Sequence, residues 1–257
     1  MTDAIKTSSL TKRYGTTTAV DALDLAVGER TVYGFLGPNG AGKTTTMRLL
    51  TGLTQPTSGT ATVAGVDVAA RDRLRSHIGY LPEEPPLYEQ ATAYEQLEYV
   101  AGLRDLPEEQ ARDRIDTLLD ALDLPEKDAR TRISGYSKGM RQKVAYVQAV
   151  LHSPDVVFLD EPTSGLDPRA ARTIRELIRT LANEGTTVFL STHILPVVEE
   201  VADTVGILYD GQLVAEGTPD ALKQRAETGG TRTLEDAFLE VTSADPASDE
   251  ASEAIDG

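Results

Sequence analysis

The chain of 257 residues contains no cysteine, which excludes a disulfide framework and any chemistry at a thiolate. It also lacks an apolar run near the roughly 20 residues that a membrane-spanning helix needs. No basic segment followed by an apolar core marks the N-terminus, so the sequence predicts no signal peptide. Together these absences predict a cytosolic protein, and they leave room for docking onto a membrane partner.

Basic residues are scarce: 25 Lys and Arg stand against 41 Asp and Glu, which gives a formal net charge of −16. This balance argues against wide contact with a phosphate backbone, so we expect no nucleic-acid partner. The acidic tail, residues 243–257, has no basic residue and is predicted to be disordered. The remaining acidity fits either adaptation to a salty cytoplasm or an ordinary acidic cytosolic protein.

Strands alternate with helices along most of the chain, which predicts an α/β fold with a mostly parallel, helix-covered sheet. Between about 92 and 122 the pattern is helical and charged, which indicates a helical subdomain at about 88–152, inserted into the core. The predicted strands are 19–27, 31–36, 60–64, 78–81, 156–159, 186–191, 205–209 and 212–215. Besides the helical stretch at about 92–122, the predicted helices are 42–51, 137–151, 168–183, 219–226 and 234–241.

One glycine-rich stretch, Gly37–Thr44, fits the phosphate-binding P-loop pattern and lies between a predicted strand and a predicted helix. Its glycines let backbone N–H groups turn toward phosphates, and the helix N-terminus adds partial positive charge. Lys43 is predicted to reach the β- and γ-phosphates of ATP, and Thr44 to offer its hydroxyl to Mg²⁺. The residues predicted to bind nucleotide at this loop are Gly37, Pro38, Asn39, Gly40, Ala41, Gly42, Lys43, Thr44 and Thr45.

An acidic pair follows a later apolar strand. Asp160 and Glu161 come directly after the run 156–159, so their carboxylates are expected at the C-terminal edge of the sheet, where ligands bind in open α/β folds. Asp160 is predicted to bind Mg²⁺. Glu161 is predicted to act as the general base that orients and polarises the attacking water.

A third motif, Tyr136–Met140, lies shortly before this pair. The three motifs in this order resemble the nucleotide-binding domain of ATP-binding-cassette transporters, over nearly the whole chain and with one such domain at 1–242. The resemblance implies a P-loop NTPase core with an antiparallel β subdomain. In that family the signature loop, usually Leu-Ser-Gly-Gly-Gln, contacts ATP held by the opposite subunit. The resemblance therefore implies that Ser137 and Gly139 bind the γ-phosphate across a head-to-tail dimer, and a homodimer is expected.

Further site residues follow from the same resemblance. The stretch Ser164–Asp167 resembles the D-loop, which joins the two sites of the dimer, and it is also a turn into a helix that starts at Pro168. His193 resembles the switch histidine that contacts the γ-phosphate and belongs to the catalytic set with Lys43 and Glu161. Tyr14 resembles the aromatic residue that stacks on adenine, and Val20 is expected to flank the base.

Four positions depart from the usual family pattern: Tyr136, Lys138 and Met140 in the signature loop, and Glu83. Glu83 stands where the family usually has a glutamine that reaches Mg²⁺ and responds to the membrane subunit. Its carboxylate is predicted to bind Mg²⁺; the alternative is a solvent-facing side chain in a loop that serves only for docking. Lys138 replaces the first glycine of the signature loop and adds a charge near the phosphate.

The resemblance implies an ATPase subunit that powers export through separate integral membrane subunits, with ATP and Mg²⁺ as ligands. Such a subunit would lie in the cytoplasm, peripheral on the inner face of the cell membrane. One alternative is a soluble cassette that acts in assembly or regulation without a membrane partner. Another is a P-loop kinase, which would need neither the signature loop nor the D-loop.

Overall fold

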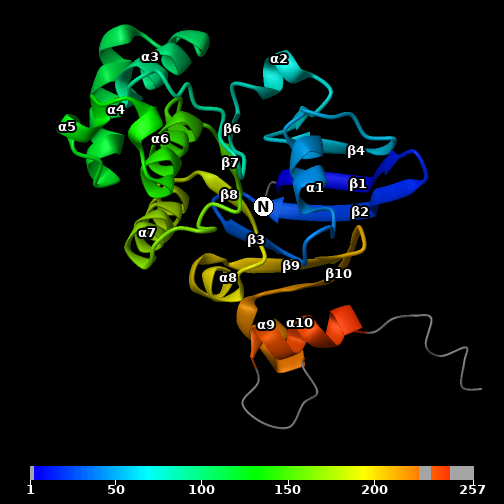
Figure 1. Ribbon diagram of the computed structural model, residues 1–257. Helices are drawn as coiled ribbons and strands as arrows, with labels where there is room; N and C mark the ends of the chain where they lie inside the picture. Colours follow the sequence, from blue (N-terminus) through cyan, green and yellow to red (C-terminus); the bar gives the residue numbers. More distant parts are fainter. Residues whose placement is uncertain (1–2, 226–232, 244–257) are drawn as a thin grey trace, which may run out of the picture.

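The computed structural model describes residues 3–225 and 233–243. Two sheets, with helices packed around them, make up the molecule (Figure 1). One sheet has four strands in the order β2-β1-β4-β5, and the other has six in the order β10-β9-β3-β8-β7-β6. Among the described residues, no helix combines the length and apolar character needed to cross a membrane.

The four-stranded sheet is antiparallel and is built around a long hairpin. Its strands are β1 (Asp3–Tyr14), β2 (Thr17–Gly28), β4 (Ser58–Val63) and β5 (Val66–Asp67). Strand β1 pairs with both β2 and β4, and its register shifts repeatedly along the hairpin. The sequence predicted β2 and β4, and it implied an antiparallel subdomain, but it did not predict β1 or β5.

The six-stranded sheet carries the parallel core. Strands β6, β7, β8, β3 and β9 run parallel, and β10 pairs with β9 antiparallel at one edge. Strands β3, β7 and β8 are buried along their whole length, which matches their near-continuous apolar sequences. Their bounds are β3 (Val32–Leu36), β6 (Ile78–Leu81), β7 (Val156–Asp160), β8 (Thr187–Thr192), β9 (Thr204–Tyr209) and β10 (Gln212–Gly217).

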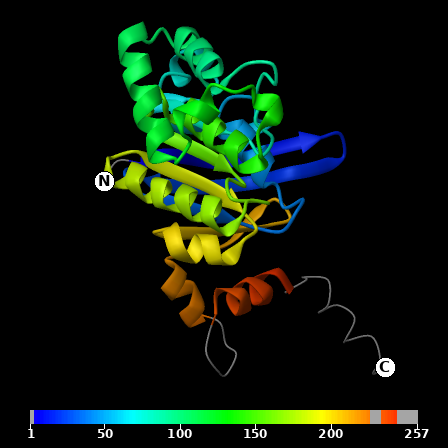
Figure 2. The same cartoon turned by 60° about the vertical axis from the view of Figure 1, so that its left-hand side comes forward.

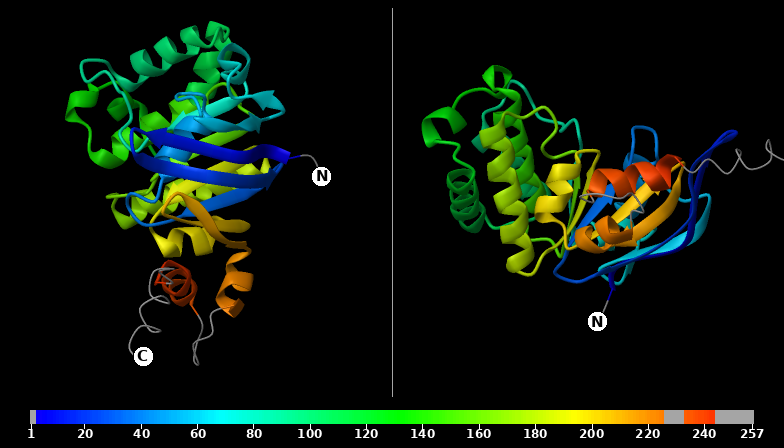
Figure 3. Two further views of the ribbon diagram at one scale, coloured as in Figure 1. Left: turned by 90° about the vertical axis from the view of Figure 1, so that its right-hand side faces the viewer. Right: turned by 90° about the horizontal axis from the view of Figure 1, so that it is seen from below.

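The two faces of this sheet are covered differently. Helix α1 (Lys43–Leu50) and the four-stranded sheet cover one face (Figure 3), where Tyr33 stacks on Phe189 with ring centroids 5.4 Å apart. Helices α7 (Pro168–Asn183) and α8 (Leu195–Val201) lie across the opposite face (Figure 2). Apolar side chains of α7, at Ile174 and Ile178, are fully buried there.

The helical region packs beside β6, which is the edge strand of the six-stranded sheet. It contains α3 (Ala93–Leu103), α4 (Glu108–Ala121), α5 (Glu126–Ala129), the 3₁₀ turn η1 (Ile133–Gly135) and α6 (Lys138–Val150). Near its C-terminal end, α6 lies so close to β6 that a Cβ on Gly79 would overlap the carbonyl oxygen of Ala149. Only glycine allows this approach of helix to strand.

The two helices nearest the C-terminus form a small layer, drawn below the six-stranded sheet in Figure 1. Helix α9 (Pro219–Arg225) and α10 (Leu234–Ser243) pack on β10 and α8, with Leu222 and Leu234 in a shared apolar cluster. The short helix α2 (Arg71–Leu74) precedes β6. Ala226, predicted to end a helix, and residues 244–257 of the predicted tail lie outside the described residues.

Candidate nucleotide-binding site

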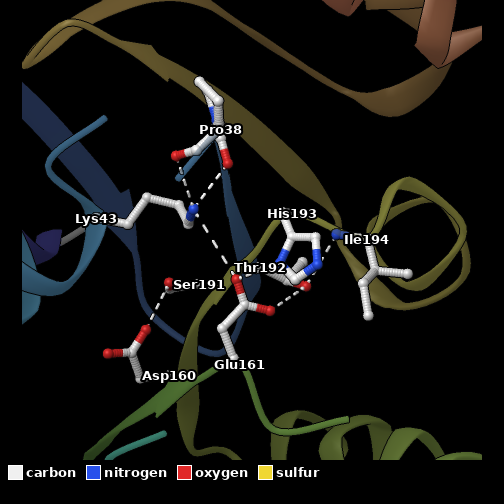
Figure 4. A network of polar contacts seen from close by, with 9 residues as sticks. Pro38, Lys43, Asp160, Glu161, Ser191, Thr192, His193 and Ile194 are labelled. Carbon is white, nitrogen blue, oxygen red and sulfur yellow. Dashed lines mark hydrogen bonds and ion pairs between the residues drawn. The ribbon is translucent and has the colours of Figure 1, made fainter. Parts of the chain in front are cut away.

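The P-loop connects the end of β3 to the start of α1, in the order that the sequence predicted. Gly42, the residue before α1, has a φ of 106°, and a Cβ there would overlap the carbonyl oxygen of Ala19. Any larger residue would therefore strain this turn and displace the strand beside it. Lys43 folds back over the loop, and its Nζ donates to the carbonyl oxygens of Gly37 at 2.7 Å and Pro38 at 3.1 Å (Figure 4).

Asp160 ends β7, and the adjacent strand β8 supplies its partner. Ser191 is the register neighbour of Asp160, and its hydroxyl donates to Oδ1 at 2.8 Å. The other carboxylate oxygen, Oδ2, is buried and has no hydrogen-bond partner among the described residues. A buried acceptor without a partner is costly in a native structure, which indicates a site that a further ligand satisfies.

Glu161, the next residue, lies in a polar network that connects Lys43 of the P-loop with His193 (Figure 4). Its Oε2 accepts a hydrogen bond from Thr192 at 3.0 Å, and His193 Nδ1 lies 2.8 Å from Oε1. The ammonium of Lys43 lies 3.9 Å from the same Oε1. Glu161 has a φ of 48°, a left-handed conformation that is strained for a residue with a long side chain. Backbone strain of this kind is typical of residues in active sites and ligand-binding sites.

These side chains border one cleft of about 520 Å³. The P-loop, the end of β7, the D-loop and the segment after β8 all contribute to its wall. Glu83 also lines it, so the residue that stands in place of the family's glutamine faces the site. The lining residues are Ala19, Asn39, Gly40, Gly42, Lys43, Thr44, Thr45, Glu83, Asp160, Glu161, Ser164 and His193.

Burial dominates the electrostatics of the cleft. It lowers the pKa of Lys43, and the nearby carboxylates of Glu161, Asp160 and Glu83 partly oppose that shift. Burial also raises the pKa of Asp160, and the nearby hydroxyls of Ser191 and Thr44 partly oppose that shift because they favour the charged form. Both groups are therefore less stable in their charged forms than they would be in water.

The signature residues lie apart from this cleft. Ser137 is the N-cap of α6, and its hydroxyl accepts a hydrogen bond from the backbone N–H of Met140 at 3.2 Å. Ser137 is exposed and Gly139 half-buried, and neither lines the cleft that holds Lys43. Within one chain, the structure thus brings together the P-loop, Asp160, Glu161, Glu83 and His193, and it leaves the signature loop outside.

The two predicted adenine contacts have different surroundings. Tyr14 is 48% exposed at the tip of the β1–β2 hairpin, and the ammonium of Lys12 lies 4.9 Å from its ring centroid. Val20 has no exposed surface, because the alternation along β2 directs it into the core between the sheets. The prediction that its side chain flanks the base is therefore corrected: the neighbouring Ala19 lines the cleft.

Sequence reasoning missed three polar residues of the site. It assigned no role to Ser191 or Thr192, and it named Ser164 only as part of the D-loop. The signal was available, because Ser191 and Thr192 end a buried strand next to the one that ends in Asp160. Hydroxyls at the C-terminal edge of adjacent parallel strands can reach each other's carboxylates.

Comparison with known proteins identifies the family. Residues 20–164 match the family model described as ABC transporter. The chain is 42% identical over 230 residues to the daunorubicin resistance ATP-binding protein DrrA3 of Streptomyces coeruleorubidus, covering 89% of this chain and 72% of the relative.

Solved structures agree with the sequence match. An ATP-binding subunit of an ABC transporter superposes with a TM-score of 0.84 at 32% identity, over 93% of this chain and 99% of that one. A post-hydrolysis dimer of the cassette MJ0796, bound to ADP and Pi, gives a TM-score of 0.76 at 25% identity, over 83% and 98%. The phosphate-binding cleft and these matches agree: the chain belongs to the ABC transporter family, as one of its ATP-binding and ATP-hydrolysing subunits.

Proposed function

We propose that this chain is the ATPase subunit of an exporter, that it forms a head-to-tail homodimer, and that it docks on separate integral membrane subunits at the inner face of the cell membrane. One observation carries the dimer. Ser137 and Gly139 lie outside the chain's own phosphate cleft, although Ser137 presents an exposed hydroxyl at a helix N-terminus. Such a group is suited to bind phosphate, and a second copy would supply that phosphate.

Hydrolysis of ATP to ADP and phosphate would use the network around Glu161. Backbone N–H groups of the P-loop and the ammonium of Lys43 would bind the β- and γ-phosphates. The carboxylate of Glu161 would accept a proton from the attacking water. His193, 2.8 Å from that carboxylate, would hold it in position and contact the γ-phosphate. Ser137 of the second copy would stabilise charge from the opposite side.

The residues present fit a Mg²⁺ ion. Asp160 has a buried oxygen without a partner among the described residues, and Thr44 and Glu83 line the same cleft. Oxygen ligands of these kinds are the ones that Mg²⁺ prefers. Thr44, Asp160 and Glu83 would hold the ion. Bound there, it would supply positive charge that offsets the negative charge developing on the phosphates during hydrolysis.

A groove beside the helical region supports the membrane partner. This docking groove has a volume of about 790 Å³ and lies between the core and α3. It combines exposed apolar side chains, Leu53 and Leu103, with several basic ones. The basic residues that line it are Arg48, Arg71, Arg75 and Arg104. The drug-resistance name of the relative supports export as the direction of transport.

The dimer is tested with Glu161→Gln, which removes the base and should trap ATP between two copies. We expect light scattering to report a dimer with Mg²⁺ and ATP and a monomer without. Adding Ser137→Asp should abolish the dimer, because aspartate keeps the helix cap but repels the phosphate. Ser76→Asp, the same change on an exposed loop, is the control. A dimer that survives Ser137→Asp would contradict the head-to-tail arrangement.

The membrane partner is tested by purifying Glu161→Gln with ATP from gently solubilised native membranes. Mass spectrometry should find a multi-span membrane protein in roughly equal amount. Recovery with soluble proteins alone, and absence from membranes, would favour the soluble assembly or regulatory function and contradict export. Neither result would change the conclusion that the chain binds ATP.

A further inference from the structure

Two of the departures from the family pattern, Glu83 and Lys138, border the same cavity. It has a volume of about 310 Å³ and lies between the loop after β6 and the start of α6. The loop contributes Glu83 and Glu84, and the helix contributes Lys138 and Arg141. The sequence separates the two departures by more than fifty residues, and the fold places them on opposite walls of one space.

Lys138 has no local role in its own helix. It is the first residue of α6, where the partial positive charge of the helix terminus disfavours a cation. Its side chain is exposed, and it forms no ion pair within 4.0 Å in the described parts of the chain. Arg141, one turn later, is paired with Glu89 at 3.7 Å. The cation at 138 is thus unfavourable where it stands and is not neutralised by a close partner.

The ammonium of Lys138 lies next to Gly165 in the D-loop. A Cβ on Gly165 would lie 2.5 Å from its Nζ, so the lysine extends over that residue. The preceding residue, Ser164, lines the phosphate cleft. The side chain therefore reaches from the first turn of α6 to the residue that follows a cleft-lining serine, in its own chain.

Glu83 stands at the boundary of both spaces. It lines the 310 Å³ cavity with Lys138 and also the phosphate cleft with Lys43. Three carboxylates, Glu83, Asp160 and Glu161, line the cleft, whereas Lys43 is the one lysine or arginine among the described residues that do so. A triphosphate entering this cleft would meet an excess of negative charge to which Glu83 contributes.

We propose that Lys138 is a positioning residue that acts within its own chain: its ammonium compensates the carboxylate of Glu83, so that a glutamate can stand beside the triphosphate. The inference rests on the proposed ATPase site. It explains these two of the departures together, because a neutral glutamine at 83 would need no compensating cation at 138. We call these two residues the 83–138 charge pair.

The test is a double-mutant cycle on MgATP binding by the full chain that carries Glu161→Gln, in which hydrolysis is blocked. Equilibrium dialysis with labelled ATP would measure the Kd. Lys138→Gln should raise it about 3- to 10-fold, as expected for one unit charge acting through partly solvated surroundings. In chains that also carry Glu83→Gln, the same substitution should change the Kd by less than about twofold.

Three further measurements separate this effect from a structural one. Lys138→Arg should restore the Kd, and high salt should diminish the effect of Lys138→Gln, because salt screens exposed charges. Glu84→Gln should not rescue Lys138→Gln, since Glu84 does not line the phosphate cleft. Lys127→Gln removes the same charge from an exposed position on α5 and should leave the Kd unchanged.

Three results would contradict the proposed role of the 83–138 charge pair. If Lys138→Gln weakens binding equally with and without Glu83→Gln, the lysine acts directly on a phosphate, and the proposal is wrong. It is also wrong if Lys138→Gln leaves the Kd unchanged, or if Glu84→Gln rescues as well as Glu83→Gln. A chain with Glu161→Gln alone that binds no MgATP would instead contradict the proposed ATPase site, and this inference with it.

Discussion

His193 Nδ1 lies 2.8 Å from Oε1 of Glu161, and this contact joins the ends of two adjacent parallel strands. Glu161 is held from three sides: its backbone N–H donates to Ser191 O at 2.9 Å, Thr192 donates to its Oε2, and Lys43 approaches its Oε1. These contacts offset the strain of a left-handed glutamate, on the order of 1–3 kcal/mol. The carboxylate is therefore fixed in place before any substrate arrives.

Removing this carboxylate should stop hydrolysis and preserve binding. Glu161→Gln is expected to lower kcat by about 10²- to 10⁴-fold, the usual contribution of a general base, with little loss in ATP affinity. His193→Ala should also lower kcat, because it frees the carboxylate to move. Phosphate release and ATP binding would be measured in parallel. Glu184→Gln, an exposed change at the far end of α7, is the control; equal activity in Glu161→Gln and the unchanged chain would contradict the assignment.

Neutralising Asp160 should stabilise the protein without nucleotide and abolish Mg²⁺-dependent hydrolysis. Burial raises the pKa of Asp160, so its charged form destabilises the fold above that raised pKa, and Asp160→Asn removes this cost. Each kcal/mol gained corresponds to a Tm increase of about 2–4 °C for a chain of this size.

The pH dependence of this effect has a defined sign. As the pH falls through the raised pKa, the carboxyl of the unchanged protein takes up a proton and the cost disappears. The Tm advantage of Asp160→Asn should therefore shrink on acidification, in calorimetry over a pH series. Asp113→Asn, an exposed change on α4, should show no advantage. A Tm that falls on Asp160→Asn at neutral pH would show that the charged form is stabilising.

Tyr14 should contribute to ATP affinity by stacking on the base. It is exposed at the hairpin tip, and base–aromatic stacking contributes about 1–3 kcal/mol. Tyr14→Ala should therefore weaken ATP binding by about 5- to 150-fold, and Tyr14→Phe should retain it. Tyr99→Ala, which removes another exposed tyrosine on α3, is the matched control. Equal binding by Tyr14→Ala and the unchanged chain would leave Tyr14 without a role at the nucleotide.

The docking groove should be sensitive to charge reversal. Burial, together with the nearby Arg75, lowers the pKa of Arg104, so a carboxylate from a partner would relieve repulsion between the two. Arg104→Glu should reduce recovery of the membrane subunit about tenfold and leave ATP binding unchanged. Arg112→Glu makes the same change of charge at an exposed position of α4 and is the control. Full recovery with Arg104→Glu would place the partner elsewhere.

The sequence predicted most of the core because its signals are local. Helix α7 has the predicted bounds, Pro168–Asn183, since Asp167 caps it and Pro168 follows. The P-loop, β7 and β8 were also predicted in place. Strand β1 was missed because its register shifts against β2 and β4 interrupt the alternation. Helix α8 was missed because it has no side-chain cap and few polar residues.

The site was predictable only in part, since its geometry depends on contacts across strands. Lys43, Asp160, Glu161 and His193 follow from motifs, and the structure brings them together. The burial of Val20 depends on the direction of one strand, which the motif does not specify. The approach of Lys138 to Gly165 joins the start of α6 to the D-loop, which are separated in the sequence by most of α6 and by β7, so no local pattern could have indicated it.

The close contact of Gly79 with Ala149 has a mechanical consequence. It fixes one end of α6 against the sheet, and Ser137 stands at the other end, as the N-cap of this 13-residue helix. Such a helix is a lever about 20 Å long, with its fulcrum at the glycine. A tilt of about 10° about that point would move Ser137 by about 3 Å, as far as the donor–acceptor distance of a hydrogen bond. A small push on the helical layer is thereby magnified where the second copy would meet it.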